Sequence, residues 1–177
     1  NGSLRQFVPN NVKYIGLDFE QGKNVDMILK SSYELPFADN SIDFAISTSC
    51  FEHSEFFWLS FKEIFRVLKS SGLFYVNAPS NGTFHRHPMD CWRFYPDASL
   101  ALLKWAAHCG HERPCILESF MKEPENDIWR DYVAVFLKDS GYINIYPTRI
   151  LDQIKNYTNG IKFGESNYSN YNEYNDK

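Results

Sequence analysis

The sequence predicts an α/β fold in which helices cover both faces of a mostly parallel sheet. Strand-like and helix-like runs alternate along the chain without an internal repeat, and most strand-like runs are apolar. Strands that are apolar on both sides are typical of a sheet buried between helical layers. We therefore expect a three-layer arrangement that binds its ligands at the carboxyl ends of the strands.

The first quarter of the chain contributes short elements. Residues 3–7 are compatible with one helical remnant, and the β-rich run 12–17 predicts the first strand. Residues 25–29 predict a shorter strand, and residues 42–48 predict the next.

An amphipathic helix is expected from Phe57 to Lys69. Its apolar residues recur at helical spacing with charged residues between them, at Phe57, Phe61, Ile64, Phe65 and Leu68. The dipeptide Ser71-Gly72 ends the helix, and residues 73–76 return as a strand. Together with the strand before it, this segment predicts a βαβ unit, in which the two strands run parallel.

The second half of the domain begins with a helix between Pro96 and Gly110, since proline favours a first helical turn and glycine the position just past the last. The runs 115–120 and 132–137 predict the closing strands. We place the domain at residues 1–138 and an extension, partly irregular, at residues 139–177.

The extension changes composition near its end. Residues 156–177 are rich in Asn, Tyr, Ser and Gly and poor in aliphatic residues, so they bury too little surface to offset their ordering entropy alone. We expect the last dozen residues to pack loosely. Their tyrosines offer contacts with the body of the protein or with a second subunit, which makes a homo-oligomer one option.

Charge and composition exclude several classes. The formal charge of the 177 residues is −4 with no basic run, which argues against nucleic acid as a partner. No apolar run approaches the ~20 residues that span a membrane, and no signal peptide opens the sequence, so we expect a cytoplasmic protein. The cysteines lack a C-x-x-C pair, which favours reduced thiols at Cys50, Cys91, Cys109 and Cys115.

Four motifs follow one another in a recognisable order. After the strand that ends at Asp18 come the segment Glu34-Leu35-Pro36-Phe37, the Asp39-x-Ser41-x-Asp43 turn, the pair Glu52-His53 and a late Trp92-Arg93-Phe94-Tyr95-Pro96 segment. From Lys13 to about Leu137 the chain resembles the small single-domain class I S-adenosylmethionine-dependent methyltransferases. The resemblance implies a Rossmann-like three-layer fold whose sheet closes with an antiparallel C-terminal strand.

The resemblance also implies a donor site for S-adenosylmethionine. Asp18 would bind the ribose hydroxyls, although a strand-end acid that caps a turn is the structural alternative. The other residues expected at the donor are Gly2, Phe19, Ser32, Tyr33, Thr48, Ser49 and Cys50, with solvated loop positions as an equal alternative for Ser32 and Tyr33. Asp39 and Asp43 are expected to be structural turn residues.

The acceptor site is expected from the segments that follow the later strands. Methyl transfer to a hydroxyl needs a group that takes the proton, and the candidates for catalysis are His53, His85, His87 and Asp90. For His53 the alternative is a hydrogen bond that fixes a loop, and Glu52-His53 often only starts the next helix in the family. The candidates for substrate binding are Asn81, Arg86, Trp92, Arg93 and Tyr95.

Two histidine-rich segments raise the question of a metal. His85, His87 and Asp90 offer imidazole and carboxylate groups, but their short spacing across a proline is not a known zinc pattern. His108, Cys109, His111 and Cys115 lack paired C-x-x-C spacing. The sequence alone therefore predicts no metal site.

The function expected from these residues is methyl transfer from S-adenosylmethionine to a small-molecule or glycan acceptor, with O-methylation as one option. The aromatic residues offer faces for an apolar or sugar ring. A methyltransferase-like binding or assembly module without turnover is the alternative. A nicotinamide-dependent oxidoreductase is a third reading, because Asp18 would also suit a nicotinamide ribose, but the ELPF and D-x-S-x-D spacing speaks against it.

One departure from the family concerns the start of the sequence. In the family a strand and a glycine-rich loop precede the strand that ends in Asp18, whereas Asn1-Gly2-Ser3 resembles only the second half of that loop. We expect the flanking strands to close on each other, or another segment to fill the slot, because buried unpaired backbone groups cost about 1–3 kcal/mol each. The expectation from this departure is a truncated form with weak or absent catalysis.

Overall fold

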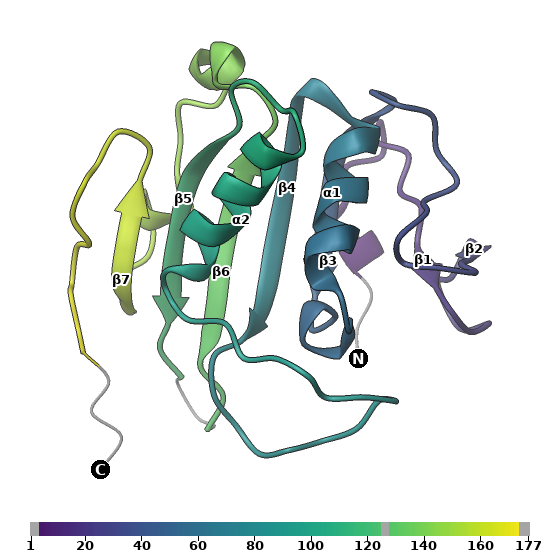
Figure 1. Cartoon of the computed structure of the whole chain (residues 1–177), viewed down its shortest axis with the longest axis horizontal. Coiled ribbons are helices and arrows are strands. Elements are labelled where there is room, and N and C mark those ends of the chain that lie inside the picture. The colour runs from purple at the N-terminus through teal and green to yellow at the C-terminus, as the bar shows by residue number, and fades with distance from the viewer. Residues whose placement is uncertain (1–3, 125–127, 174–177) are drawn as a thin grey trace.

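The computed structural model describes residues 4–124 and 128–173. Five strands form the main sheet in the order β3-β4-β6-β5-β7. Two α-helices, α1 (Phe57–Val67) and α2 (Ala98–His108), lie side by side over one face of this sheet (Figure 1). Among the described residues, no helix combines the length and the apolar character that a membrane crossing requires.

The βαβ unit is present as predicted. Strand β3 (Ile42–Thr48) matches its expected bounds, and it pairs in parallel with β4 (Leu68–Pro79). Helix α1 connects the two strands, and β4 is longer than the expected run because Leu68 leaves the helix directly in an extended conformation. Both strands therefore end at the same edge of the sheet.

The C-terminal half of the sheet is antiparallel. Strand β6 (Asp131–Leu137) pairs antiparallel with β4 and with β5 (Cys115–Lys122). Strand β7 (Tyr157–Lys162) adds antiparallel to the outer edge of β5. This strand was not predicted from the sequence, because its Asn and Gly residues are poor strand formers. It is held by pairing with β5 on one side and by the Gly160–Ser169 bridge on the other.

The predicted α/β Rossmann-like class is confirmed, but the third layer is thinner than expected. The face opposite α1 and α2 is covered by two 3-10 helices, η3 (Ser140–Ile145) and η4 (Ile150–Asp152), rather than by α-helices. They pack Ile143, Tyr146 and Ile150 against buried side chains of β5 and β6. The buried Glu118 carboxylate accepts both the Ile150 and Leu151 backbone N–H groups, at 2.9 Å each.

The core lies between the α-helices and the sheet. Phe61 and Phe65 of α1 stack with ring centroids 4.4 Å apart, and Phe61 meets Phe136 of β6 edge-on at 5.0 Å. All three side chains are fully buried. Such pairs add about 0.5–1.5 kcal/mol each to the free energy gained from burying apolar area, so the predicted apolar face of α1 anchors it on the sheet.

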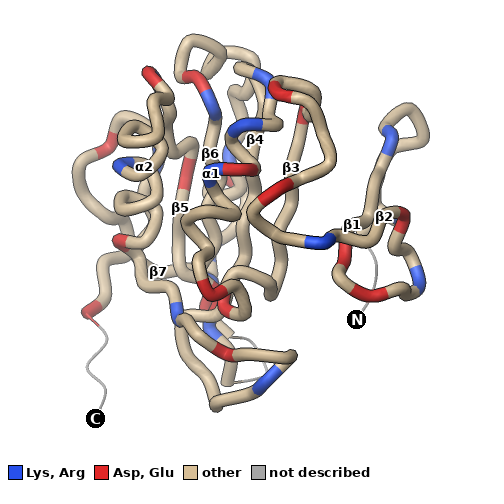
Figure 2. The backbone as a smooth tube through the Cα atoms, turned by 45° about the vertical axis from the view of Figure 1, so that its right-hand side comes forward, with Lys and Arg blue, Asp and Glu red and all other residues tan. Residues whose placement is uncertain are grey.

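The N-terminal strands are separate from the main sheet. A 3-10 turn η1 (Leu4–Phe7) precedes β1 (Leu17–Asp18) and β2 (Met27–Ile28), which pair only with each other and in parallel. Figure 2 shows this pair protruding beside the sheet, with acidic and basic residues interspersed along the whole tube.

The expectation that the strands next to the slot would close on each other, or that a segment of this chain's own tail would fill it, is wrong for the described residues. Between β1 and β3 no pairing is present, and Phe44 and Ile46 of β3 remain 48% and 39% exposed. The slot stays open because unpaired backbone groups are costly only when they are buried, whereas backbone groups at an exposed sheet edge bind water. Of the predicted strand 12–17 only Leu17 is in β1, which ends at Asp18, since this strand has a partner on one side only.

Candidate functional site

The edge where β3 and β4 end carries three of the residues expected at the donor, Thr48, Ser49 and Cys50. After Thr48, Ser49 turns the backbone with a left-handed φ of 46°, and its N–H donates to the Asn77 carbonyl of β4 at 3.0 Å. The 3-10 turn η2 (Phe51–His53) follows, and its Phe51 ring is buried 5.6 Å from Phe74. This buried ring fixes the turn, and the turn places Cys50 and His53 at the edge of the sheet where β3 and β4 end.

Asp18 ends β1 and is exposed. Its Oδ1 accepts the Phe19 N–H at 2.7 Å and the Glu20 N–H at 3.4 Å, which orients the carboxylate and leaves Oδ2 available. The adjacent Phe19 side chain is 52% exposed. An oriented carboxylate beside an exposed ring fits the ribose end of a nucleoside, while the hydrogen bonds also show the turn-capping role considered from the sequence.

Cys50 lies near two carboxylates. Although the residue is exposed, desolvation of its thiol raises the thiol pKa, and the charges of Glu52 and Asp18 raise it further. Asp18 therefore lies near enough to act on this thiol, although β1 and β3 do not pair. A raised pKa keeps the thiol neutral at pH 7, so Cys50 is suited to lining a site rather than to nucleophilic attack.

The Ser31–Phe37 segment is tied to α1. The Glu63 carboxylate accepts the Leu35 N–H at 2.7 Å, and Arg66 donates to the Leu35 and Phe37 carbonyls at 3.1 and 3.0 Å. At the start of the same segment, the Ser31 hydroxyl accepts the Tyr33 N–H at 3.1 Å, and the Tyr33 hydroxyl accepts the Phe56 N–H at 3.3 Å. Ser32 and Tyr33 are thus half-buried residues of a braced loop. The expected donor residue Gly2 lies outside the described residues.

Three histidines and a glutamate meet above this edge. The ring centroids of His53 and His85 are 5.1 Å apart, and those of His87 lie 6.3 Å from His53 and 6.0 Å from His85. Glu52 Oε1 lies 3.6 Å from His53 Nε2, and the Glu52 side chain is only 2% exposed. We call Glu52, His53, His85 and His87 the histidine cluster.

Glu52 is the residue of this cluster that the sequence analysis did not propose for catalysis. Burial raises the pKa of its carboxyl, while the nearby His53, His85 and Arg93 lower it to a smaller degree. In the sequence, the Glu52-His53 pair was the signal that could have identified Glu52 as a site residue, but a role in starting the next helix explained the pair equally well. Only the packing of the later loop over η2 shows that the carboxylate faces histidines.

Asp90 is engaged in an ion pair instead of lying free. Its oxygens accept from both terminal nitrogens of Arg93 at 2.5 and 2.9 Å, and from the His85 backbone N–H at 2.8 Å. The Arg93 hydrogen bonds hold the pKa of this carboxyl well below its usual range. Asp90 and Arg93 therefore shape the loop that carries His85, and an ionised, paired carboxylate is a weak proton acceptor at pH 7.

The segment between β4 and α2 forms the long loop at the carboxyl end of the sheet in Figure 1. Asn81 fastens it by donating to the Ile128 carbonyl at 2.8 Å and accepting the Arg130 N–H at 2.7 Å. Trp92 donates to the Ser54 carbonyl at 2.9 Å, while Arg86 bonds within the loop to the Pro88 carbonyl at 3.3 Å. Tyr95 remains 55% exposed.

A shallow, open pocket of about 270 Å³ lies along this loop, lined by Gly82, Phe84, Asp90, Cys91, Trp92 and Arg93. Phe84 is 75% and Trp92 37% exposed, so aromatic faces border a charged pair. Asp90 connects the pocket to the histidine cluster, because its Oδ2 lies 3.5 Å from His85 Nδ1. The sequence analysis anticipated Trp92 and Arg93 here but not Phe84.

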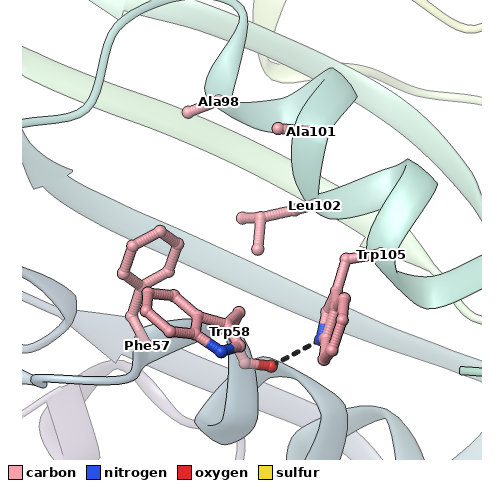
Figure 3. A pocket seen from close by; sticks show the side chains of 6 residues that line it. All are labelled: Phe57, Trp58, Ala98, Ala101, Leu102 and Trp105. Carbon is pink, nitrogen blue, oxygen red and sulfur yellow. Dashed lines mark hydrogen bonds between the residues drawn. The ribbon is translucent and has the colours of Figure 1, made fainter. Parts of the chain in front are cut away.

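A second pocket, of about 230 Å³, lies between the two helices (Figure 3). It is almost entirely apolar, and its lining residues are Phe57, Trp58, Ala98, Ala101, Leu102 and Trp105. Trp105 Nε1 closes one side by donating to the Trp58 carbonyl at 2.8 Å. The histidine cluster and Asp18 do not line this pocket, and it offers no polar group for chemistry.

Comparison with known proteins agrees with this arrangement. Residues 6–76 match the family described as "Methyltransferase domain". This match assigns a methyltransferase domain to residues 6–76. The recognition made from the motifs is confirmed, and so is the assignment as an S-adenosylmethionine-dependent methyltransferase enzyme. No match is found among curated proteins.

Solved methyltransferase structures share the fold. A SAM-dependent methyltransferase of Methanosarcina mazei is 17% identical with a TM-score of 0.53, and the alignment covers 71% of this chain and 81% of that one. The 1,6-didemethyltoxoflavin-N1-methyltransferase of Burkholderia thailandensis, solved with that substrate and S-adenosylhomocysteine, is 15% identical with a TM-score of 0.52. That alignment covers 70% of this methyltransferase and 60% of the Burkholderia protein.

Proposed function

We propose that this methyltransferase transfers the methyl group to a hydroxyl of a small molecule that presents an apolar or sugar-type ring. The observation that carries the proposal is the position of the histidine cluster, which lies beside the aromatic pocket and above the strand ends. A proton acceptor is needed only when the nucleophile carries a proton, as a hydroxyl does. The Burkholderia enzyme, which acts on a small molecule, supports this class of acceptor.

The proposed donor site is formed by residues at the strand ends. Asp18 Oδ2 would accept a ribose hydroxyl, and the exposed Phe19 ring would pack beside the nucleoside. Thr48, Ser49 and Cys50 would line the donor from the end of β3, with Ser32 and Tyr33 near the adenine. The bound S-adenosylmethionine supplies a methyl group activated by its positively charged sulfur.

The proposed acceptor site is the pocket of the long loop. Phe84 and Trp92 would stack on the acceptor ring, and the Asp90-Arg93 pair would keep the loop in place. In the reaction the acceptor oxygen forms a bond to the methyl carbon while the carbon–sulfur bond breaks and its electron pair stays on sulfur. The hydroxyl proton passes to the histidine cluster.

His87 is the best member of the cluster to take that proton. The Nδ1 atoms of His53 and His85 are engaged with carbonyls of Met89 and Thr83, whereas His87 is exposed and makes no hydrogen bond among the described residues. A neutral imidazole whose nitrogens are free can accept a proton from a neighbouring hydroxyl, which suits a general base.

The test is methyl transfer to a panel of hydroxylated aromatic and sugar-type compounds, measured as release of S-adenosylhomocysteine. We expect His87→Ala to lower kcat about 100-fold, as removal of a general base does, without changing donor affinity. His108→Ala, which removes a histidine stacked on Trp105 away from the cluster, is the matched control. Full activity in His87→Ala, or transfer only to amines, would contradict the proposal.

A further inference from the structure

Three side chains of the histidine cluster are arranged as metal ligands. Glu52, His53 and His85 each offer one ligand atom, and these atoms all lie within 4.8 Å of one another. Two ligands of a tetrahedral zinc ion are separated by about 3.3 Å, given bonds of about 2.0–2.2 Å. The Glu52 Oε1 to His53 Nε2 distance of 3.6 Å is already close to that value, so small rotations of the side chains would complete the triad.

The hydrogen bonds of the two histidines fix the tautomer that a metal requires. A backbone carbonyl only accepts, so the Nδ1 atoms of His53 and His85 must donate to the Met89 and Thr83 carbonyls. The Nε2 atom of each neutral ring then keeps its lone pair. A metal-binding imidazole almost always donates its other N–H to a carbonyl or carboxylate in this way, and His85 Nδ1 has the Asp90 carboxylate 3.5 Å away in addition.

The state of Glu52 is a second, independent observation. The residue is 1% exposed, and its Oε2 atom makes no hydrogen bond among the described residues. A buried carboxylate oxygen without a partner is costly, and native structures pair such groups with a donor, a water or an ion. The backbone of Glu52 is firmly held, because its carbonyl accepts the Cys91 N–H at 2.7 Å, so the carboxylate is presented from a fixed position.

We propose that Glu52, His53 and His85 bind one zinc-class divalent cation. Two imidazole nitrogens and one carboxylate oxygen are the donors that favour such ions over Mg²⁺ or Ca²⁺, which prefer oxygen ligands alone. The nearby Arg93 charge is offset by its ion pair with Asp90. His53 and His85 side chains are 16% and 29% exposed, so the triad leaves one side of the cation open.

Cation binding is independent of the reaction, but its role rests on the proposed function. In that role the cation would polarise the oxygen of an acceptor bound at the neighbouring loop pocket before His87 takes the proton. His87 stays outside the ligand set. The cation-binding and proton-accepting residues are therefore separable by substitution.

The experiment is a calorimetric titration of the purified, chelator-treated protein with Zn²⁺ alone, in the absence of S-adenosylmethionine. We expect one Zn²⁺ per chain, with affinity at least tenfold weaker in Glu52→Gln and in His85→Asn. His85 is on a loop, so its replacement tests the site even if Glu52→Gln fails to fold, as judged by circular dichroism. His87→Ala and His108→Ala are the matched histidine controls and should bind as the unaltered protein does.

The outcomes separate this inference from the proposed function. Absence of Zn²⁺ binding, equal binding in the two ligand variants, or competition by Mg²⁺ at equal concentration would overturn the metal site. Normal Zn²⁺ binding together with failure of every hydroxyl acceptor would overturn the proposed function and leave the metal site standing. Co²⁺ bound in place of Zn²⁺ gives a second readout, because its visible absorption spectrum reports imidazole ligands. We expect this absorption to be lost in His85→Asn.

Discussion

At the scale of single residues, the same chemical group has different roles according to its partners. Asp18 and Asp90 were both candidates from the sequence. Asp90 is neutralised by Arg93 and braces a loop, whereas Asp18 keeps an oxygen available at the end of β1. Glu52 is the opposite case, since its buried carboxylate has one oxygen without a hydrogen bond. The partner, and not the residue type, decides which carboxylate is available to a ligand.

Asp18 gives the residue-scale prediction. Asp18→Ala should weaken binding of S-adenosylhomocysteine at least tenfold, because each lost charge-assisted hydrogen bond to the ribose is worth about 1.5–3 kcal/mol. Isothermal titration calorimetry measures the change. Asp43→Ala is the matched control, because Asp43 is an exposed carboxylate near the opposite end of β3, paired with Lys69. Unaltered affinity in Asp18→Ala would place the donor elsewhere.

At the scale of elements, helix α1 organises the site as well as the core. Its apolar side packs on the sheet, and its polar side holds the Ser31–Phe37 segment through Glu63 and Arg66. The hydrogen bond from Arg66 lowers the pKa of the Glu63 carboxyl from its ordinary 4.5, and the hydrogen bond from the Leu35 N–H has a smaller effect in the same direction. An acid whose pKa is lower when folded stabilises the protein above its unfolded pKa and loses that contribution as the pH falls.

Glu63→Gln should therefore lower the free energy of unfolding by about 1–2 kcal/mol at pH 7. The difference from the unaltered protein should shrink as the pH falls from 4.5 through the lower folded pKa, because Glu63 then becomes neutral too. Urea unfolding at a series of pH values measures both effects. Glu55→Gln, at an exposed position before α1, should change neither. A difference that stays constant between pH 7 and pH 3 would exclude the ionised carboxylate as its cause.

At the scale of the whole molecule, the structure consists of a continuous five-stranded sheet and a small separate pair, β1-β2. Strands β4 and β6 lie inside the sheet with buried side chains, whereas β1 and β2 have one strand partner each and exposed positions. Local opening is easiest where few backbone hydrogen bonds and few apolar contacts must break. Asp18, the residue proposed to bind the ribose, thus lies in the less stable part.

Hydrogen exchange should show this division. We expect amides of β1 and β2 to exchange at least 100-fold faster than those of β4 and β6, since their opening does not require the main sheet to unfold. Native-state exchange followed by mass spectrometry resolves the four segments. Addition of S-adenosylhomocysteine should slow exchange in β1 and leave β6 unchanged. Equal protection of β1 and β6 in the free protein would show that the two sheets open together.

The sequence by itself determined the elements whose stability is local. Strand β3 and helix α1 were predictable because their apolar residues are spaced as a strand and a helix require. Gly110, just after α2, has a left-handed φ of 92°, as expected for a glycine that ends a helix. The ordered motifs also determined the methyltransferase recognition. The tertiary structure decided everything that depends on contacts distant in sequence. Strand β7 depends on pairing with β5 and with the segment around Ser169. Within the described residues, β1 has no partner towards β3. Glu52 faces His85 only because the long loop folds back over η2.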